Sequence, residues 1–252
     1  MTYSVCIDAV FGRIDPAESI RAVREAGFTA AEFWSWQNRD LDALAAAAKE
    51  NGVTIASFCA KVVSLVDPDK RPDYIAALKE SIAVAKKLGC KNMIAQTGPD
   101  NGKDRGEQHD SIVAGLREAK PLLEDAGVTL LLEPLNTYVD HKGYYLWQSS
   151  EAYAIIDAVD SKNVRVLFDI YHQQIMEGNL IPNIQAGKDR IAYFHVAGHP
   201  GRHEPDVGEI HYPAVIEAIR QTGYDGFIGL EYFPLKNPLE SLRDTAKSLP
   251  RP

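Results

Sequence analysis

Short runs of apolar residues recur along the chain, and stretches with a helical repeat separate them. Several runs are apolar throughout rather than alternating with polar residues, which is typical of strands buried on both faces of a parallel sheet. The predicted strands are YSVCI (3–7), FTAAEF (28–33), VTIASF (53–58), NMIAQ (92–96), VTLLLE (128–133), VRVLFD (164–169), IAYFH (191–195) and GFIGLE (226–231).

The stretches between these runs repeat their apolar positions with the period of a helix. The first has Pro16 in its first turn and Gly27 at its end, which is the usual asymmetry of a helix. Pro121 interrupts the fourth stretch, where we expect a kink. The predicted helices span residues 16–27, 41–52, 73–89, 107–127, 149–159, 178–189, 212–223 and 238–249.

Eight strand–helix units in 252 residues average about 30 residues each, which is typical of a (β/α)8 TIM barrel. A doubly wound open sheet is the alternative, but no Gly-rich phosphate-binding loop follows any predicted strand. The sequence has no low-complexity tract and no linker. We therefore expect an α/β fold, with residues 1–252 forming a single TIM-barrel domain.

Active residues of a barrel lie where strands end and loops begin. Four consecutive predicted strands end on a polar residue, namely Glu133, Asp169, His195 and Glu231. Each acidic residue could instead be only the cap of the following helix. Because the pattern repeats at four neighbouring strands, coincidence is a weaker explanation than a shared site.

Three carboxylates cannot share a small site in their ionised form unless a cation neutralises them. Carboxylate oxygens together with one imidazole nitrogen suit Mn²⁺, Mg²⁺, Co²⁺ or Zn²⁺. The four residues therefore predict a site for one divalent metal ion, with Mn²⁺ as the first choice.

The overall composition restricts the classes of partner. Apolar residues make up 45% of the chain and charged residues 25%, which indicates a globular protein. The net charge of −8 would repel a phosphate backbone, so we expect no nucleic-acid partner. No apolar run approaches the ~18 residues of a membrane helix, so we expect no membrane partner.

The start of the chain, MTYSVCIDAVF, lacks the basic region and cleavage site of a secretory signal. The three cysteines, Cys6, Cys59 and Cys90, have no paired or metal-type spacing and lie in or beside apolar segments. We expect them to be small buried hydrophobic residues. Reduced thiols without an export signal indicate a cytoplasmic protein.

Four segments in the second half carry a resemblance to a known family. They are LLLEPLN (130–136), FDIYHQQIMEGNL (168–180), GHPGRHEPDVGEIHY (198–212) and GLEYFP (229–234). They resemble the hydroxypyruvate isomerase and ketose 3-epimerase branch of the xylose isomerase-like TIM barrel superfamily. The resemblance runs over the whole chain, and it implies a barrel with a divalent metal and a possible homo-oligomer.

By this resemblance, Glu133, Asp169, His195 and Glu231 match the metal ligands of the family. Glu133 and Glu231 also match its catalytic acid–base pair. Hydroxypyruvate isomerases place a glutamine at the position of His195, whereas ketose 3-epimerases place a histidine there. The ligand set therefore leaves the exact substrate open between the two groups.

The resemblance also implies two contacts with substrate. His172, three residues after Asp169, matches a histidine that contacts substrate. Arg202 matches an arginine that holds substrate oxygens with its planar guanidinium. A structural salt bridge from Arg202 to Glu204 or Glu209 is the alternative interpretation.

Residues that follow strands two to five are further candidates for contacts with substrate. Glu32 ends strand two, Lys61 follows strand three, and Gln96 closes strand four. Trp34 could form an apolar wall against the C–H face of a sugar, although core packing explains it equally well. His141, in the loop after strand five, could be an additional acid or base.

These features predict a metal-dependent isomerase. It would interconvert a small aldose and ketose, or a hydroxypyruvate-type substrate, by moving a proton through an enediolate. A 3-epimerase that acts on a free ketose at the same site is the alternative. Dehydratase or carbon–glycoside lyase activity, a nuclease for damaged DNA and a non-catalytic sugar-binding barrel fit less well.

Overall fold

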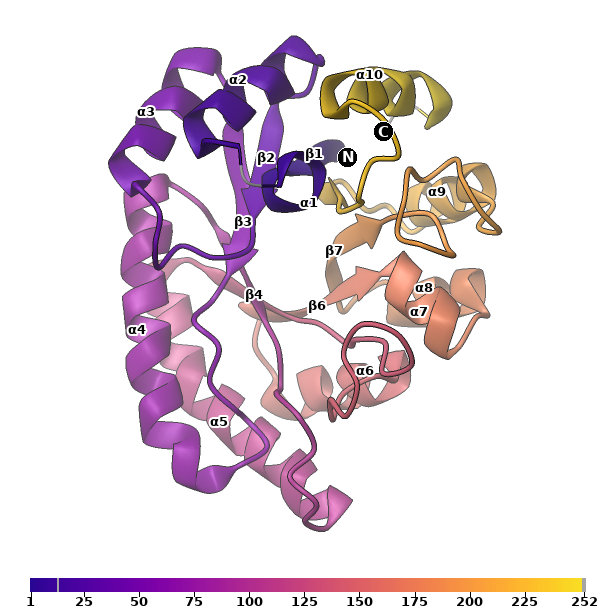
Figure 1. Cartoon of the computed structure of the whole chain (residues 1–252). Coiled ribbons are helices and arrows are strands. Elements are labelled where there is room, and N and C mark those ends of the chain that lie inside the picture. Colours follow the sequence, from indigo (N-terminus) through magenta and orange to yellow (C-terminus); the bar gives the residue numbers. More distant parts are fainter. Residues whose placement is uncertain (13, 251–252) are drawn as a thin grey trace.

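The computed structural model describes residues 1–12 and 14–250, and its strands form the predicted barrel (Figure 1). Eight parallel strands pair in sequence order, and β1 pairs with β8 to close the sheet. The strands are β1 (Thr2–Cys6), β2 (Ala30–Phe33), β3 (Thr54–Cys59), β4 (Asn92–Ala95), β5 (Thr129–Leu132), β6 (Val164–Asp169), β7 (Ile191–Val196) and β8 (Phe227–Leu230).

Eight helices match the eight predicted ones, with bounds that differ by no more than two residues at either end. They are α2 (Pro16–Glu25), α3 (Leu41–Asn51), α4 (Arg71–Leu88), α5 (Arg105–Ala126), α6 (Ser149–Val159), α8 (Leu180–Gly187), α9 (Tyr212–Gln221) and α10 (Pro238–Ser248). The helix α5 continues through Pro121 as one element.

Three short elements were not predicted, namely α1 (Ile7–Phe11), the 3-10 turn η1 (Pro68–Lys70) and α7 (Ile170–Met176). Both α1 and α7 start at the residue that follows a strand, so no loop separates the residues of the strand from those of the helix. Such short helices hold too few residues for a 3.6-residue period to be recognised.

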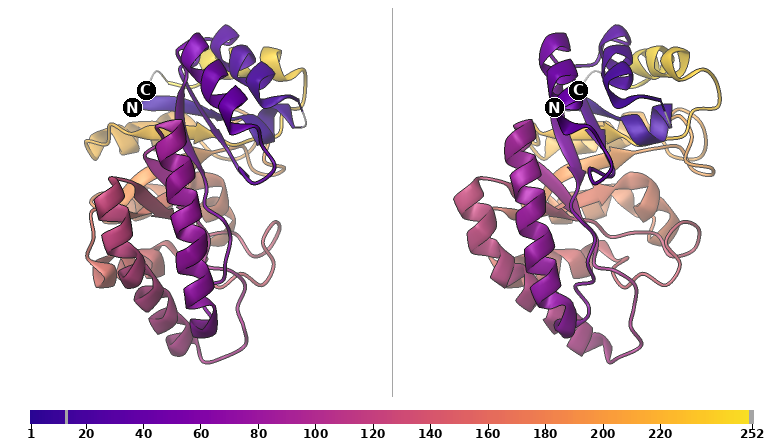
Figure 2. Two further views of the ribbon diagram at one scale, coloured as in Figure 1. Left: turned by 90° about the vertical axis from the view of Figure 1, so that its left-hand side faces the viewer. Right: turned by 60° about the vertical axis from the view of Figure 1, so that its left-hand side comes forward.

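The long helices α4 and α5 pack side by side along one flank of the barrel (Figures 1 and 2). The helix α5 has 22 residues, but many of its side chains are charged. Within residues 1–12 and 14–250, no helix is both long and apolar enough to cross a membrane.

The inside of the barrel is filled by side chains that come from the strands alone. One buried apolar cluster consists of Ala30, Ala56, Ile94, Leu131, Leu167 and Tyr193, one from each of β2 to β7. A larger cluster fills the space between the strands and the helices. Because the barrel is packed below, a cavity can open only toward the carboxyl ends of the strands.

Replacing Leu131 by alanine should test this inner packing. Its side chain is fully buried, so we expect Leu131→Ala to lower the free energy of unfolding by about 2–5 kcal/mol. Chemical denaturation followed by circular dichroism measures the change. The control is Leu235→Ala, at a side chain that is 61% exposed, and it should alter stability little. Equal effects of the two variants would contradict a packed barrel interior.

Candidate active site

Four polar side chains meet at the carboxyl ends of the last four strands. Asp169 ends β6 and His195 lies in β7, while Glu133 and Glu231 directly follow β5 and β8. All four are buried, and one possible ligand atom from each lies within 4.8 Å of all the others. The strand ends therefore bring together the four residues that the sequence predicts as ligands.

The imidazole of His195 lies at the centre of this group. Its Nδ1 is 3.0 Å from Oε2 of Glu231, 3.7 Å from Oε1 of Glu133 and 3.9 Å from Oδ2 of Asp169. Nevertheless, Nδ1 has no hydrogen-bond partner among the described residues. A buried nitrogen without a partner requires an explanation, and a metal ion among three carboxylates provides one.

Asp169 caps a helix with one carboxylate oxygen and faces the cluster with the other. Its Oδ1 accepts a hydrogen bond of 3.1 Å from the backbone N–H of His172 and so caps α7. Its Oδ2 faces the cluster and accepts a hydrogen bond of 3.0 Å from Arg202. The cap fixes the direction of the carboxylate, so the two interpretations do not exclude each other.

Arg202 lies in the loop between β7 and α9 and is only 8% exposed. Its guanidinium donates to the carboxylates of Asp169 and Glu231 and lies 4.9 Å from the ring centre of Tyr171. Its third acidic neighbour is Asp140, at 3.8 Å. The predicted alternative, a salt bridge to Glu204 or Glu209, is not formed among the described residues. Arg202 thus forms its ion pairs with the cluster and with Asp140 rather than within its own loop.

The loop that carries Arg202 is tied to the segment after β8. The backbone N–H of Phe233 donates to the carbonyl of Arg202 at 2.7 Å. The buried carboxylate of Glu204 accepts a hydrogen bond of 2.6 Å from Ser241 and one of 3.1 Å from the N–H of Leu235. Arg202 itself adopts a φ of 57°, which is uncommon for a residue other than glycine. These contacts hold a strained residue in one position over the cluster.

The charges of the cluster shift the pKa of each member. Burial raises the pKa of Glu133 to about 7. Burial also raises the pKa of Asp169, although Arg202 and His195 oppose the shift. For Glu231, burial acts in the same direction, but Arg202 and His195 outweigh it and hold its pKa well below the ordinary value.

The pKa of the His195 imidazole shifts in the direction opposite to the effect of burial. Burial lowers the pKa of His195, but the carboxylates of Glu231 and Glu32 outweigh burial and raise that pKa well above its ordinary value. Five carboxylates, those of Glu32, Glu133, Asp140, Asp169 and Glu231, thus surround one guanidinium and one imidazole. This excess of negative charge and oxygen donors suits a hard divalent cation.

His172 is oriented by a neighbour that the sequence analysis did not select. Asn136 uses Oδ1 to accept from the backbone N–H groups of Val139 and Asp140, both at 3.0 Å. Its Nδ2 must therefore donate to Nδ1 of His172, at 2.6 Å. Burial lowers the pKa of His172 well below its ordinary value, so the ring is neutral. The proton lies on Nε2, which faces Asp169 at 3.4 Å and is a hydrogen-bond donor at the site.

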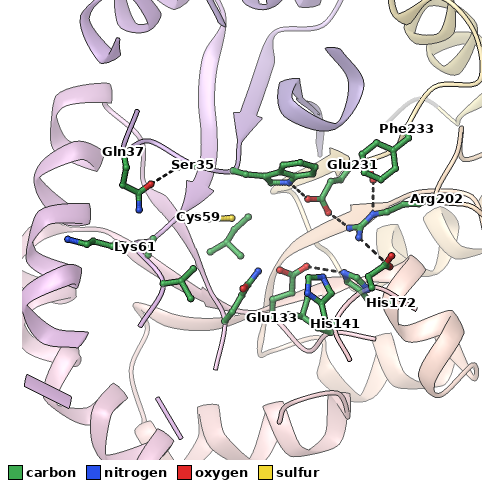
Figure 3. Close-up of a pocket in the computed structure, with 17 residues that line it drawn as sticks. Ser35, Gln37, Cys59, Lys61, Glu133, His141, His172, Arg202, Glu231 and Phe233 are labelled. Carbon is green, nitrogen blue, oxygen red and sulfur yellow. Dashed lines mark hydrogen bonds and ion pairs between the residues drawn. The ribbon is translucent and has the colours of Figure 1, made fainter. Parts of the chain in front are cut away.

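A cavity of about 660 Å³ opens above the cluster (Figure 3). Glu133, His141 and His172 lie on one side of it, and Glu231, Arg202 and Phe233 on another. Its lining residues are Trp34, Ser35, Gln37, Cys59, Ala60, Lys61, Val62, Ile94, Gln96, Glu133, Leu135, Asp140, His141, His172, Arg202, Glu231 and Phe233. This volume is within the usual range for small-molecule sites, roughly 300–1,000 Å³.

Three of the four further candidates from the first half of the chain line this cavity. Trp34 donates from its indole nitrogen to Oε1 of Glu231. Gln96 accepts a hydrogen bond of 3.3 Å from the hydroxyl of Tyr144, and the ammonium of Lys61 pairs with Glu80 at 2.7 Å. Glu32 is not a lining residue. It lies against His195, with its Oε1 2.8 Å from Nε2.

Sequence reasoning missed Asn136 and Asp140 and left His141 open. Asn136 was part of a recognised motif, but its contacts depend on the path of residues 137–146, which no local pattern predicts. In the structure this loop brings Asp140 within 3.8 Å of Arg202 and the His141 ring within 5.3 Å of the His172 ring. Cys59 also differs from its prediction, because it is partly exposed and lines the cavity, whereas Cys6 and Cys90 are buried.

Comparisons with known proteins show the family of the chain. Residues 20–251 match the model of a family described as "Xylose isomerase-like TIM barrel". The chain is 33% identical over 220 residues to a 2-oxo-tetronate isomerase of Cupriavidus necator, covering 82% of this chain and 83% of the relative. It is 28% identical over 253 residues to hydroxypyruvate isomerase of Escherichia coli, covering 96% and 97%.

Solved structures have the same architecture. A structure from Brucella melitensis described as AP endonuclease, family 2, has a TM-score of 0.93 at 28% identity and covers 99% of this chain and 100% of that chain. A D-psicose 3-epimerase of Clostridium cellulolyticum with D-tagatose has a TM-score of 0.81 at 23% identity, covering 98% and 92%. At that lower identity, the second likeness concerns the fold alone.

Proposed function

The chain belongs to the xylose isomerase-like TIM barrel family, and we propose that it is a metal-dependent isomerase of a small sugar or hydroxy-carbonyl compound. The observation that carries the proposal is the convergence of Glu133, Asp169, His195 and Glu231 within 4.8 Å beneath an open cavity. The isomerase names of the curated relatives support the same reaction class.

We propose that these four residues hold one divalent metal ion, with Mn²⁺ as the first choice. The free Nδ1 of His195 and the three carboxylates fit such an ion by donor type and by charge. Mg²⁺, Co²⁺ or Zn²⁺ are the alternatives. When bound, the cation supplies Lewis acidity that makes the proton next to a carbonyl group easier to remove.

The two glutamates differ in how freely they can exchange a proton. Both carboxylate oxygens of Glu231 accept hydrogen bonds, one from Trp34 and one from Arg202. The carboxylate of Glu133 receives no side-chain or backbone hydrogen bond within the described residues, and the nearest imidazole nitrogen, Nδ1 of His195, lies 3.7 Å from its Oε1. Glu133 would therefore take the proton and return it, with Glu231 as the second member of the pair.

Several neighbours would hold the substrate in place. The Nε2–H of His172 can donate to a substrate oxygen, and the guanidinium of Arg202 can do the same. Trp34 and Phe233 form an edge-to-face pair, with ring centres 6.3 Å apart, in the wall of the cavity. Such aromatic surface suits the C–H face of a sugar. The proton would then move through an enediolate between adjacent carbons.

A 3-epimerase of a free ketose is the second candidate. The cavity of about 660 Å³ equals the volume of about 20 water molecules at roughly 30 Å³ each, which is generous for a three-carbon acid. The two cationic side chains in its wall are already paired, Lys61 with Glu80 and Arg202 with Asp169 and Glu231. An uncharged ketose would need no further cation, whereas a carboxylate substrate would have to displace one of these pairs.

A nuclease fits the site less well, despite the description of the Brucella structure. The net charge of −8 and the acidic residues in the cavity wall would repel a phosphate backbone. The aldose–ketose and epimerase reactions need no phosphate backbone in the cavity, so we retain them as the two proposals.

Removing the metal tests the proposed function directly. We expect chelator treatment followed by buffer exchange to abolish activity, and Mn²⁺ to restore it, because the metal ion held by the cluster is the proposed Lewis acid. The substrates are a panel of three- to six-carbon sugars and hydroxypyruvate in deuterated water. NMR detects deuterium entering the substrate, and the labelled carbon separates isomerisation from 3-epimerisation.

The comparison of chelated and reloaded samples includes its own control. Calorimetric titration with Mn²⁺ measures binding on the same protein, and circular dichroism verifies that the chelated protein is folded. Turnover that persists in metal-free protein would contradict the metal-dependent reaction. Tight metal binding with no turnover on any substrate of the panel would favour a non-catalytic sugar-binding barrel instead.

A further inference from the structure

Two side chains close around His195 on the side away from the cluster. Glu32, on β2, places its Oε1 2.8 Å from Nε2 of His195, while the phenol of Tyr193 donates to Oε2 of Glu32. All three side chains are at most 2% exposed. The contact between Glu32 and His195 is an ion-pair contact rather than a linear hydrogen bond. The imidazole of His195 therefore presents Nδ1 to the cluster and Nε2 to Glu32.

The neighbouring strand leaves room for this contact. Gly229 on β8 pairs in register with His195 on β7. A Cβ atom at Gly229 would lie 2.6 Å from Oε1 of Glu32 and 2.6 Å from Cδ2 of His195. Real Cβ atoms do not approach other atoms so closely, so any side chain at this position would push Glu32 and His195 apart.

The position of Glu32 does not fit a contact with substrate. It does not line the cavity, and it is buried among strand residues. Burying a carboxylate is costly unless charged or hydrogen-bonding partners compensate for it. The partners of Glu32 are the phenol of Tyr193 and the imidazole of His195. Its location is thus explained by its effect on His195.

We propose that Glu32 is a positioning residue for the metal, an inference that rests on the proposed metal site. Its negative charge keeps the proton of the imidazole on Nε2, so that Nδ1 presents its lone pair to the cluster. Tyr193 orients the carboxylate that does this. Carboxylates in this outer position fix the orientation of ligating histidines and raise their basicity, and their loss typically weakens metal binding by about 10–100-fold.

Metal titrations of matched variants test the proposal. Calorimetry with Mn²⁺ compares the wild-type protein with Glu32→Gln, Glu32→Ala and Tyr193→Phe. We expect Glu32→Gln to weaken binding about 10-fold and Glu32→Ala up to about 100-fold, because glutamine keeps an acceptor but loses the charge. Tyr193→Phe keeps the carboxylate, so its effect should be smaller than that of either change at Glu32.

The chain offers a closely matched control. Glu151 also accepts a hydrogen bond from a tyrosine, with Tyr145 Oη 2.6 Å away, and neither residue lines the cavity. Glu151→Gln should leave the affinity for Mn²⁺ unchanged, even if it lowers the melting temperature. A purely structural role of Glu32 predicts the same behaviour for Glu32→Gln.

A spectroscopic measurement distinguishes ligand orientation from general loosening of the fold. We expect the visible absorption bands of the Co²⁺-loaded protein to shift in Glu32→Gln, and to coincide with wild type in Glu151→Gln. If folded Glu32→Gln binds Mn²⁺ with wild-type affinity and gives the wild-type Co²⁺ spectrum, the positioning role is wrong. If Glu32→Ala does not fold, Glu32→Gln and Tyr193→Phe decide the question. Failure of the wild-type protein to bind metal would overturn the proposed metal site itself.

Discussion

Replacing Glu133 by glutamine should lower the turnover rate by at least about 100-fold, which is the usual contribution of a general acid–base group. Glutamine has nearly the same shape but can neither accept nor return the proton. The carboxylate is also a proposed ligand, so part of the loss can come from weaker metal binding. The rate of deuterium entry into substrate, measured at saturating Mn²⁺, separates the two contributions.

The control for this variant is Glu209→Gln, which changes a carboxylate on the loop between β7 and α9. The side chain of Glu209 is 55% exposed and does not line the cavity. It should retain the wild-type exchange rate. An exchange rate in Glu133→Gln that equals wild type at saturating metal would rule out Glu133 as the base. Glu231→Gln tested in the same way decides whether the second carboxylate exchanges a proton as well.

Removing the guanidinium of Arg202 should have a large effect on stability that depends on metal. Arg202→Ala leaves the buried carboxylates of Asp169 and Glu231 without their cationic partner, and breaking such a pair costs about 3–5 kcal/mol. For a chain of this length, we expect the melting temperature of the metal-free protein to fall by about 10 °C. A bound divalent cation would compensate the same carboxylates, so the loss should shrink at saturating Mn²⁺.

Differential scanning calorimetry with and without Mn²⁺ measures both values. Arg202→Lys keeps the positive charge but loses the planar fork, so its melting temperature should lie between those of wild type and Arg202→Ala. The charge-balance role of Arg202 would be contradicted by a loss of stability that is the same in both metal conditions. A larger loss with Mn²⁺ than without it would contradict it as well.

The predicted elements show what kind of information a local pattern carries. The eight strands were recognisable because each is a short apolar run, and the last four of them end on a polar residue that marks the carboxyl end. Since parallel strands end at one rim, the same pattern located Glu133, Asp169, His195 and Glu231 together. Burial on both faces was predicted from the continuously apolar runs, and closure of the barrel from the eight strand–helix units and the lack of a Gly-rich phosphate-binding loop.

The remaining features depend on contacts between distant segments. Glu32 lies on a predicted strand, but only the packing of β2 against Tyr193 and His195 determines that it faces Nε2 of His195 rather than the cavity. Asn136 orients His172 only because residues 137–146 fold back over it. Neither relation leaves a periodic signal in the sequence.

The two halves of the chain contribute differently to the cavity. Acidic and imidazole groups come from β5 to β8 and their loops, while Gln37 and Lys61 extend from the β2 and β3 side (Figure 3). Reaction chemistry and substrate choice can therefore diverge separately during evolution. Exchanges in the β2 and β3 loops would change which molecule enters, while the proposed acid–base residues opposite them stay the same.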